Sequence, residues 1–224
     1  MSAPTLNSLG QRIRKTSTLI CFLPLLVLTN VASAIPLTTW NFAGNNGNEA
    51  SVNATFVAPG FQTTAITRGG TQSPQVAPDT FSNGSWPFTS ALDGYFQFSI
   101  SPEAGTTYSV SSVEFDLVSN FLGPTHWVLR SDVDAFGSNL DEWIDFSASS
   151  MHTTTLSLDP SFQNLTGDRT FRLYGLDSSG GGGGLTRLQI NGSAPILSVP
   201  ETLPFGAFGL TMALLLYGRS RIKK

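Results

Sequence analysis

Short stretches in which apolar and polar residues alternate dominate residues 35–195, and no helical period of useful length appears there. In YFQFSI, residues 95–100, phenylalanine and isoleucine occupy every second position, with tyrosine, glutamine and serine between them. Residues 108–118, YSVSSVEFDLV, alternate in a similar way. Successive side chains of a β-strand point to opposite faces, so this pattern predicts strands with one buried face.

Further alternating stretches follow at short spacing: HWVLRS, TTLSL, RTFRLYGL and LTRLQIN. Turn-forming pairs such as Gly123-Pro124 and Asp159-Pro160 separate the stretches, and nothing between them indicates a βαβ unit. The predicted fold class is therefore all-β, with a single antiparallel β-sandwich of the jelly-roll type over residues 35–194. About 160 residues are enough for one domain with its own core.

The charge of this body excludes some classes of function. It carries five arginines and fourteen acidic residues, a net charge of −9, and all the lysines lie near the chain ends. An acidic body repels phosphate backbones, so we expect no nucleic-acid partner. The single cysteine, Cys21, precedes the body, which therefore has no disulfide, cysteine nucleophile or cysteine metal site.

Residues 1–34 have the features of a secretory signal peptide. A positively charged region precedes an apolar run at 19–28, and it is formed by Arg12, Arg14 and Lys15. The small residues Ala32 and Ala34 supply a cleavage site for signal peptidase. The mature chain is therefore predicted to begin at Ile35 and to be exported.

Residues 195–224 combine three features in order. A short motif comes first, then a predicted transmembrane helix at 203–218, then a basic tail at 219–224. The motif consists of Val199, Pro200, Glu201 and Thr202, and the tail carries Arg219, Arg221, Lys223 and Lys224. The apolar run 203–217 would span about 22 Å as a helix, less than the ~30 Å hydrocarbon core. The positive tail would stay in the cytoplasm, with the body outside.

This three-part ending resembles the PEP-CTERM sorting signal, although Thr202 stands where that motif has its second proline. The resemblance implies recognition and processing by an exosortase, an integral-membrane protease. It also implies a Gram-negative bacterium that makes exopolysaccharide, with the protein held briefly in the inner membrane and then passed to the cell surface or extracellular matrix. A plain tail anchor is the alternative interpretation.

The body also resembles the jelly-roll body of many PEP-CTERM proteins, through HWVLRS and FRLYG, over about residues 95–193. A shared fold does not confer an activity. We therefore expect no enzymatic activity, and a structural or adhesive role in an exopolysaccharide or biofilm matrix.

Tryptophans suggest an alternative role as a carbohydrate-binding module. Trp86 in GSWPF and Trp143 in DEWID lie in polar, loop-like segments, where an exposed ring could stack on a sugar. Packing in the core is the competing interpretation. A glycan hydrolase, which would use two carboxylates, is a further alternative, but the sequence singles out no pair.

Acidic residues around Gly137 could bind calcium through oxygen ligands: Asp132, Asp134, Asp141 and Glu142. An EF-hand is excluded because its fifth and twelfth positions would be Phe136 and Trp143. A solvated acidic loop is the alternative. No other cofactor is expected, since the two histidines lack a zinc-site spacing and His126 is predicted to be structural.

The five-glycine run at 180–184 is not a phosphate-binding loop, because no Lys-Ser/Thr pair follows it. We expect it to form a flexible hairpin loop.

Overall fold

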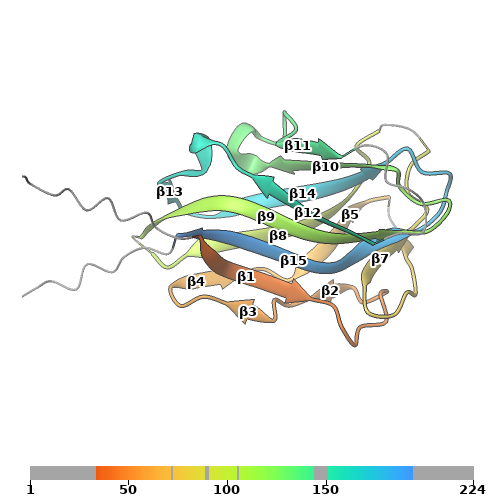
Figure 1. Cartoon of the computed structure of the whole chain (residues 1–224), viewed down its shortest axis with the longest axis horizontal. Coiled ribbons are helices and arrows are strands. Elements are labelled where there is room, and N and C mark those ends of the chain that lie inside the picture. The colour runs from red at the N-terminus through yellow and green to blue at the C-terminus, as the bar shows by residue number, and fades with distance from the viewer. Residues whose placement is uncertain (1–33, 72, 89–90, 105, 144–150, 194–224) are drawn as a thin grey trace, which may run out of the picture. The chain divides into compact units, whose positions relative to one another are not determined.

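The computed structural model describes residues 34–71, 73–88, 91–104, 106–143 and 151–193, with the backbone alone for Trp143 (Figure 1). The described residues form two antiparallel sheets and two short 3₁₀ helices, η1 (Asp132–Asp134) and η2 (Pro160–Phe162). The prediction of an all-β sandwich is confirmed. Within the described part of the chain, no helix has the length and apolar character that a membrane crossing requires.

The first sheet has eight strands, and its central path runs in the order β12-β9-β15-β1-β3. β13 also pairs with β9, and β7 pairs with both β15 and β6. The strands are β1 (Ile35–Asn41), β3 (Phe56–Val57), β6 (Ser73–Pro74), β7 (Phe81–Gly84), β9 (Thr107–Ser119), β12 (Met151–Ser157), β13 (Leu165–Thr166) and β15 (Gly183–Ser193).

The second sheet has seven strands in the order β11-β10-β14-β8-β5-β2, and β4 also pairs with β8. The strands are β2 (Ser51–Val52), β4 (Phe61–Thr63), β5 (Ile66–Gly70), β8 (Gly94–Pro102), β10 (His126–Ser131), β11 (Asp141–Trp143) and β14 (Arg169–Leu176). Neighbours in the sheet are often far apart in the sequence, so most of the pairing is non-local.

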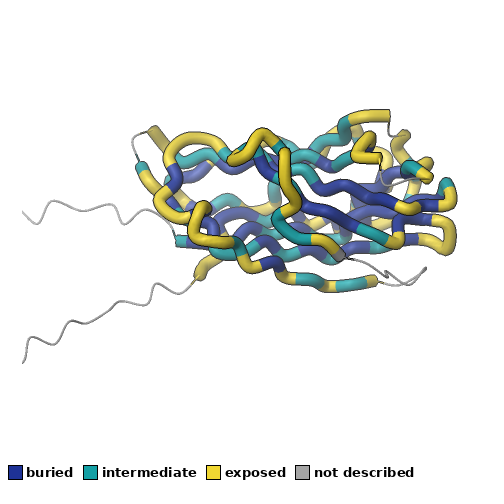
Figure 2. The backbone as a smooth tube through the Cα atoms, turned by 90° about the horizontal axis from the view of Figure 1, so that it is seen from above, coloured by how far each residue is buried: buried dark blue, intermediate teal, exposed yellow. Residues whose placement is uncertain are grey.

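The core lies between the two sheets and follows the predicted alternation. Phe96, Phe98 and Ile100 of β8 are fully buried, as are Phe115 and Leu117 of β9. Rings from opposite sheets meet there, since the Phe98 and Phe115 centroids lie 6.3 Å apart in an edge-on arrangement. Figure 2 shows the buried backbone along the strands and the exposed backbone mostly at the connections.

One arginine ties the two sheets together. Arg68 of β5 donates hydrogen bonds to the carbonyl oxygens of Gly47, Glu49 and Ser82, and Ser82 belongs to β7 in the other sheet. Its guanidinium carbon lies 3.8 Å from the Phe81 ring centroid. Burial lowers the pKa of Arg68 to about 10, against the attraction of Glu49, and the group remains protonated at neutral pH.

Candidate functional site

The residues predicted to direct export and sorting lie mainly outside the described residues. This applies to Ala32, to the motif at 199–202 and to the basic tail at 219–224. β1 begins at Ile35, the first residue after the predicted cleavage site. Signal cleavage and exosortase processing stay predictions.

Trp86 is a core residue, which confirms the core-packing interpretation, and the alternative of an exposed ring that contacts glycans is wrong. Its exposed fraction is 0%, and its ring packs edge-on against Phe96 and Trp127, with centroids 5.3 and 5.2 Å away. Its indole N–H donates to the carbonyl oxygen of Gly183 at 3.1 Å. A ring enclosed in this way has no face free for a sugar. Trp143 pairs with Trp127 through the backbone, and its side chain lies outside the described residues, so its glycan contact stays a prediction.

The four acidic residues proposed as calcium ligands do not form one site. Asp134 accepts hydrogen bonds from the Ser138 hydroxyl and from the backbone of Ser138 and Gly137, and these bonds hold the pKa of its carboxyl below the ordinary value. Glu142 instead faces His126, with Oε1 2.9 Å from Nε2. Among the described residues, no group of three or more histidine, cysteine or acidic side chains could hold a metal ion.

His126 occupies the outer face of the second sheet, between two carboxylates. Its Nε2 lies 2.9 Å from Glu142 Oε1, and its Nδ1 lies 3.3 Å from Asp177 Oδ2. The side chain is only 13% exposed. The two contacts join β10, β11 and the segment after β14, so this histidine links neighbouring parts of the sheet.

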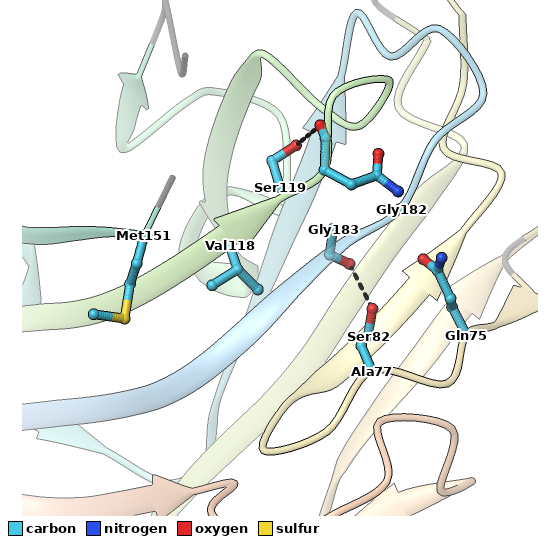
Figure 3. Close-up of a pocket in the computed structure, with 9 residues that line it drawn as sticks. Gln75, Ala77, Ser82, Val118, Ser119, Met151, Gly182 and Gly183 are labelled. Carbon is cyan, nitrogen blue, oxygen red and sulfur yellow. Dashed lines mark hydrogen bonds between the residues drawn. The ribbon is translucent and has the colours of Figure 1, made fainter. Parts of the chain in front are cut away.

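A hollow of the body lies at one end of the first sheet, where β7, β9, β12 and β15 come together (Figure 3). Its volume is about 400 Å³, within the usual range for small-ligand sites. Every side chain that lines it is uncharged. The polar ones are Gln75, Ser82, Ser119 and Asn120, and the larger apolar ones are Val118 and Met151.

The polar groups of this cavity differ in whether they already form hydrogen bonds within the protein. The Ser119 hydroxyl donates to the carbonyl oxygen of Pro124 at 2.9 Å, and the side-chain oxygen of Asn120 accepts from the backbone N–H of Leu122 at 3.1 Å. The amide of Gln75 packs against Gly182, and no side-chain hydrogen bond to Gln75 is found among the described residues. Gln75 is therefore the side chain most free to bind a ligand.

The five-glycine run forms a tightly packed wall of the cavity, and the prediction of a flexible loop is wrong. Residues 181–184 are buried, and Gly183 and Gly184 begin β15, where they pair with β7 on one side and β9 on the other. A β-carbon on Gly184 would stand 2.5 Å from the carbonyl oxygen of Phe81. Glycine is needed there because three backbone segments approach too closely for a side chain.

Comparisons with known proteins show similar folds at low identity and assign the chain to no family. Neither a protein-family model nor a curated protein matches the chain. The K3 cleaved adhesin domain of Lys-gingipain from Porphyromonas gingivalis is 11% identical, with a TM-score of 0.39, over 71% of this chain and 99% of that domain. The family 29 carbohydrate-binding module CBM29-2 is 17% identical, with a TM-score of 0.31, over 64% of this chain and 86% of that one. Values this low carry no argument about activity.

Proposed function

We propose that this chain is an exported cell-surface or extracellular-matrix protein of a Gram-negative bacterium, with an adhesive or structural β-sandwich body and no enzymatic role. Signal peptidase would cleave before Ile35, and residues 203–218 would hold the chain briefly in the inner membrane. An exosortase would then recognise residues 199–202 and process the tail. The order of these segments around one all-β body supports the proposal.

The cavity beside the five-glycine run is the observation that carries a binding role. Hydroxyl and amide groups there stand beside the apolar surfaces of Val118 and Met151, and the glycine wall is held in place by strand pairing. Such a lining suits a neutral ligand that has both hydroxyl groups and an apolar face. A neutral saccharide has this chemistry, so the cavity favours a carbohydrate-binding role within the matrix.

Retention of the full chain, kept soluble in detergent, on immobilised neutral glycans and on the host's exopolysaccharide tests this role. Gln75→Ala removes the amide that is free in the cavity and should weaken retention by about tenfold. Gln62→Ala is the control, because Gln62 lines a separate hollow of the body beside Glu103 and Asp168. Equal retention of wild type and Gln75→Ala would reject the cavity as the glycan site.

Mass spectrometry of the intact protein from its native host tests the sorting proposal. We expect a species that starts at Ile35 and lacks the basic tail, and we expect Pro200→Ala to leave the tail in place. Ser198→Ala, just before the motif, is the matched control and should still be processed. A wild-type protein ending at Lys224 in cells with an active exosortase would rule out processing.

A further inference from the structure

Two arginines stand opposite each other on the outer face of the second sheet. Arg130 of β10 and Arg172 of β14 are register partners, so their side chains leave the sheet side by side. Like charges directly opposite each other on neighbouring strands are destabilising. The pair is unusual in a body with fourteen acidic residues and five arginines.

The Arg172 guanidinium is held in place from several directions. Its central carbon lies 4.4 Å from the Tyr95 ring centroid and 4.0 Å from the Phe136 ring centroid. Its Nε donates to the side-chain oxygen of Gln97 at 2.9 Å. These contacts leave both Nη groups without a hydrogen-bond partner among the described residues, and both keep contact with solvent. The two Nη groups of Arg172 are therefore held in a fixed position, ready to donate hydrogen bonds to a ligand.

Arg130 is fixed by the segment that follows its own strand. Its Nε donates to Asn139 Oδ1 at 2.8 Å, and its Nη1 donates to the carbonyl oxygen of Phe136 at 2.9 Å. Phe136 has a φ of 62°, in the left-handed region that bulky residues avoid. This strained residue contributes its ring to Arg172 and its carbonyl to Arg130. Backbone strain of this kind is concentrated at functional sites.

Carboxylates do not neutralise either arginine in the described part of the chain. The carboxylates that contact basic side chains there are Glu142 and Asp177, beside His126, and Glu114 and Asp116, which pair with Arg187. Glu142 instead accepts a hydrogen bond from the amide of Asn139, the residue that also holds Arg130. Two guanidinium groups are thus held in place without a carboxylate partner among the described residues.

We propose that Arg130 and Arg172 form a binding site for a carboxylate group carried by an acidic saccharide. A guanidinium presents parallel N–H donors that match the two oxygens of a carboxylate, and charge-assisted hydrogen bonds of this type are strong. That the carboxylate belongs to a saccharide rests on the proposed matrix function. That the ligand is an anion rests on the arginine pair alone. This site lies on the other sheet from the cavity and differs from it in charge.

Binding of trigalacturonate to the full chain in detergent, measured by calorimetry, tests the site. A short oligomer at physiological ionic strength is used because the body's net charge of −9 repels long polyanions over distances set by the Debye length. Arg172→Gln should weaken binding by about tenfold or more, and Arg130→Gln should also weaken it. Arg172→Lys should weaken it as well, because lysine keeps the charge but has no planar fork.

Arg187→Gln is the matched control, since it removes one guanidinium from the other sheet and changes the net charge equally. Its affinity should stay within about twofold of wild type. Equal weakening by Arg172→Gln and Arg187→Gln, or no binding of trigalacturonate to wild type, would overturn the proposal. Tighter, Arg172-dependent binding of triglutamate or of a sulfated trisaccharide would overturn the assignment to a carboxylate on a saccharide. Binding of neutral glycans, lost only in Gln75→Ala, reports separately on the proposed function.

Discussion

The side chain of Gln75 occupies the position that a β-carbon on Gly182 would take. The two residues are far apart in the sequence, and their contact forms one corner of the cavity (Figure 3). The contact involves the far end of a flexible side chain, whereas the neighbouring Gly184 faces the backbone of Phe81 and Ser82. The two glycines therefore differ in what a substitution would displace.

We expect Gly182→Ala to turn the Gln75 amide out of its place at little cost to stability. Gly184→Ala should lower the free energy of unfolding by about 1–3 kcal/mol, because a backbone segment must move. Urea denaturation of both variants measures the difference. Equal destabilisation by the two substitutions would contradict this account of the wall.

Trp86→Ala should lower the free energy of unfolding by about 3–5 kcal/mol, since it leaves a cavity among Phe96, Trp127 and Gly183. Trp86→Phe should cost less, but it still removes the hydrogen bond to the Gly183 carbonyl, worth about 1 kcal/mol. Phe121→Ala is the control, because Phe121 is 77% exposed. Denaturation curves in which Trp86→Ala matches this control would show that the ring is not packed.

Arg68→Lys should destabilise the protein by about 1–3 kcal/mol, because one ammonium group cannot replace the guanidinium on the carbonyls of Gly47, Glu49 and Ser82. Arg187→Lys, at a partly exposed ion pair, should cost less than about 1 kcal/mol. Urea midpoints at neutral pH compare the two variants. A smaller effect at Arg68 than at Arg187 would refute the role of Arg68 in joining the sheets.

Asp116 should make stability depend on pH under acidic conditions. Burial raises the pKa of this carboxyl, but hydrogen bonds from Arg187 at 2.8 Å and Thr153 at 2.7 Å outweigh burial, and the pKa lies below its ordinary value. A lowered folded-state pKa stabilises the protein above the unfolded-state pKa of about 3.9, and this stabilisation is lost as pH falls through the folded value.

The expected result is a gap in unfolding free energy between wild type and Asp116→Asn at pH 6 to 7. The gap should begin to narrow as the pH falls below about 4 and should close below the folded-state pKa of Asp116. Thermal unfolding across this range provides the measurement. A gap that persists unchanged into strong acid would mean that the charge of Asp116 is not its source.

Local pattern was sufficient to predict the strands of the core. Residues 95–100 and 108–118 alternate in the sequence and form parts of β8 and β9, with Phe98 and Phe115 meeting between the sheets. This prediction succeeds because the period of two is a property of the extended chain itself. It requires no knowledge of which strands become neighbours.

The sequence left the role of Trp86 open and gave the wrong prediction for the five-glycine run, because their surroundings come from distant parts of the chain. GSWPF reads as a polar loop, yet Trp86 is enclosed by Trp127 and by the backbone of Gly183. The glycines read as flexible, yet β7 and β9 pair with them on both sides. The composition of a segment indicates its intrinsic conformational flexibility, but it does not indicate which residues pack against the segment.

The sequence by itself determined the all-β class, the acidic charge of the body and the period of its main strands, because these depend on residue type and local spacing. Only the tertiary structure decided that Arg130 stands beside Arg172 and that Gln75 lies over Gly182. Each pair is joined by long-range strand pairing or loop packing, and no local pattern encodes that register. The candidate binding sites are therefore a product of the sheet order.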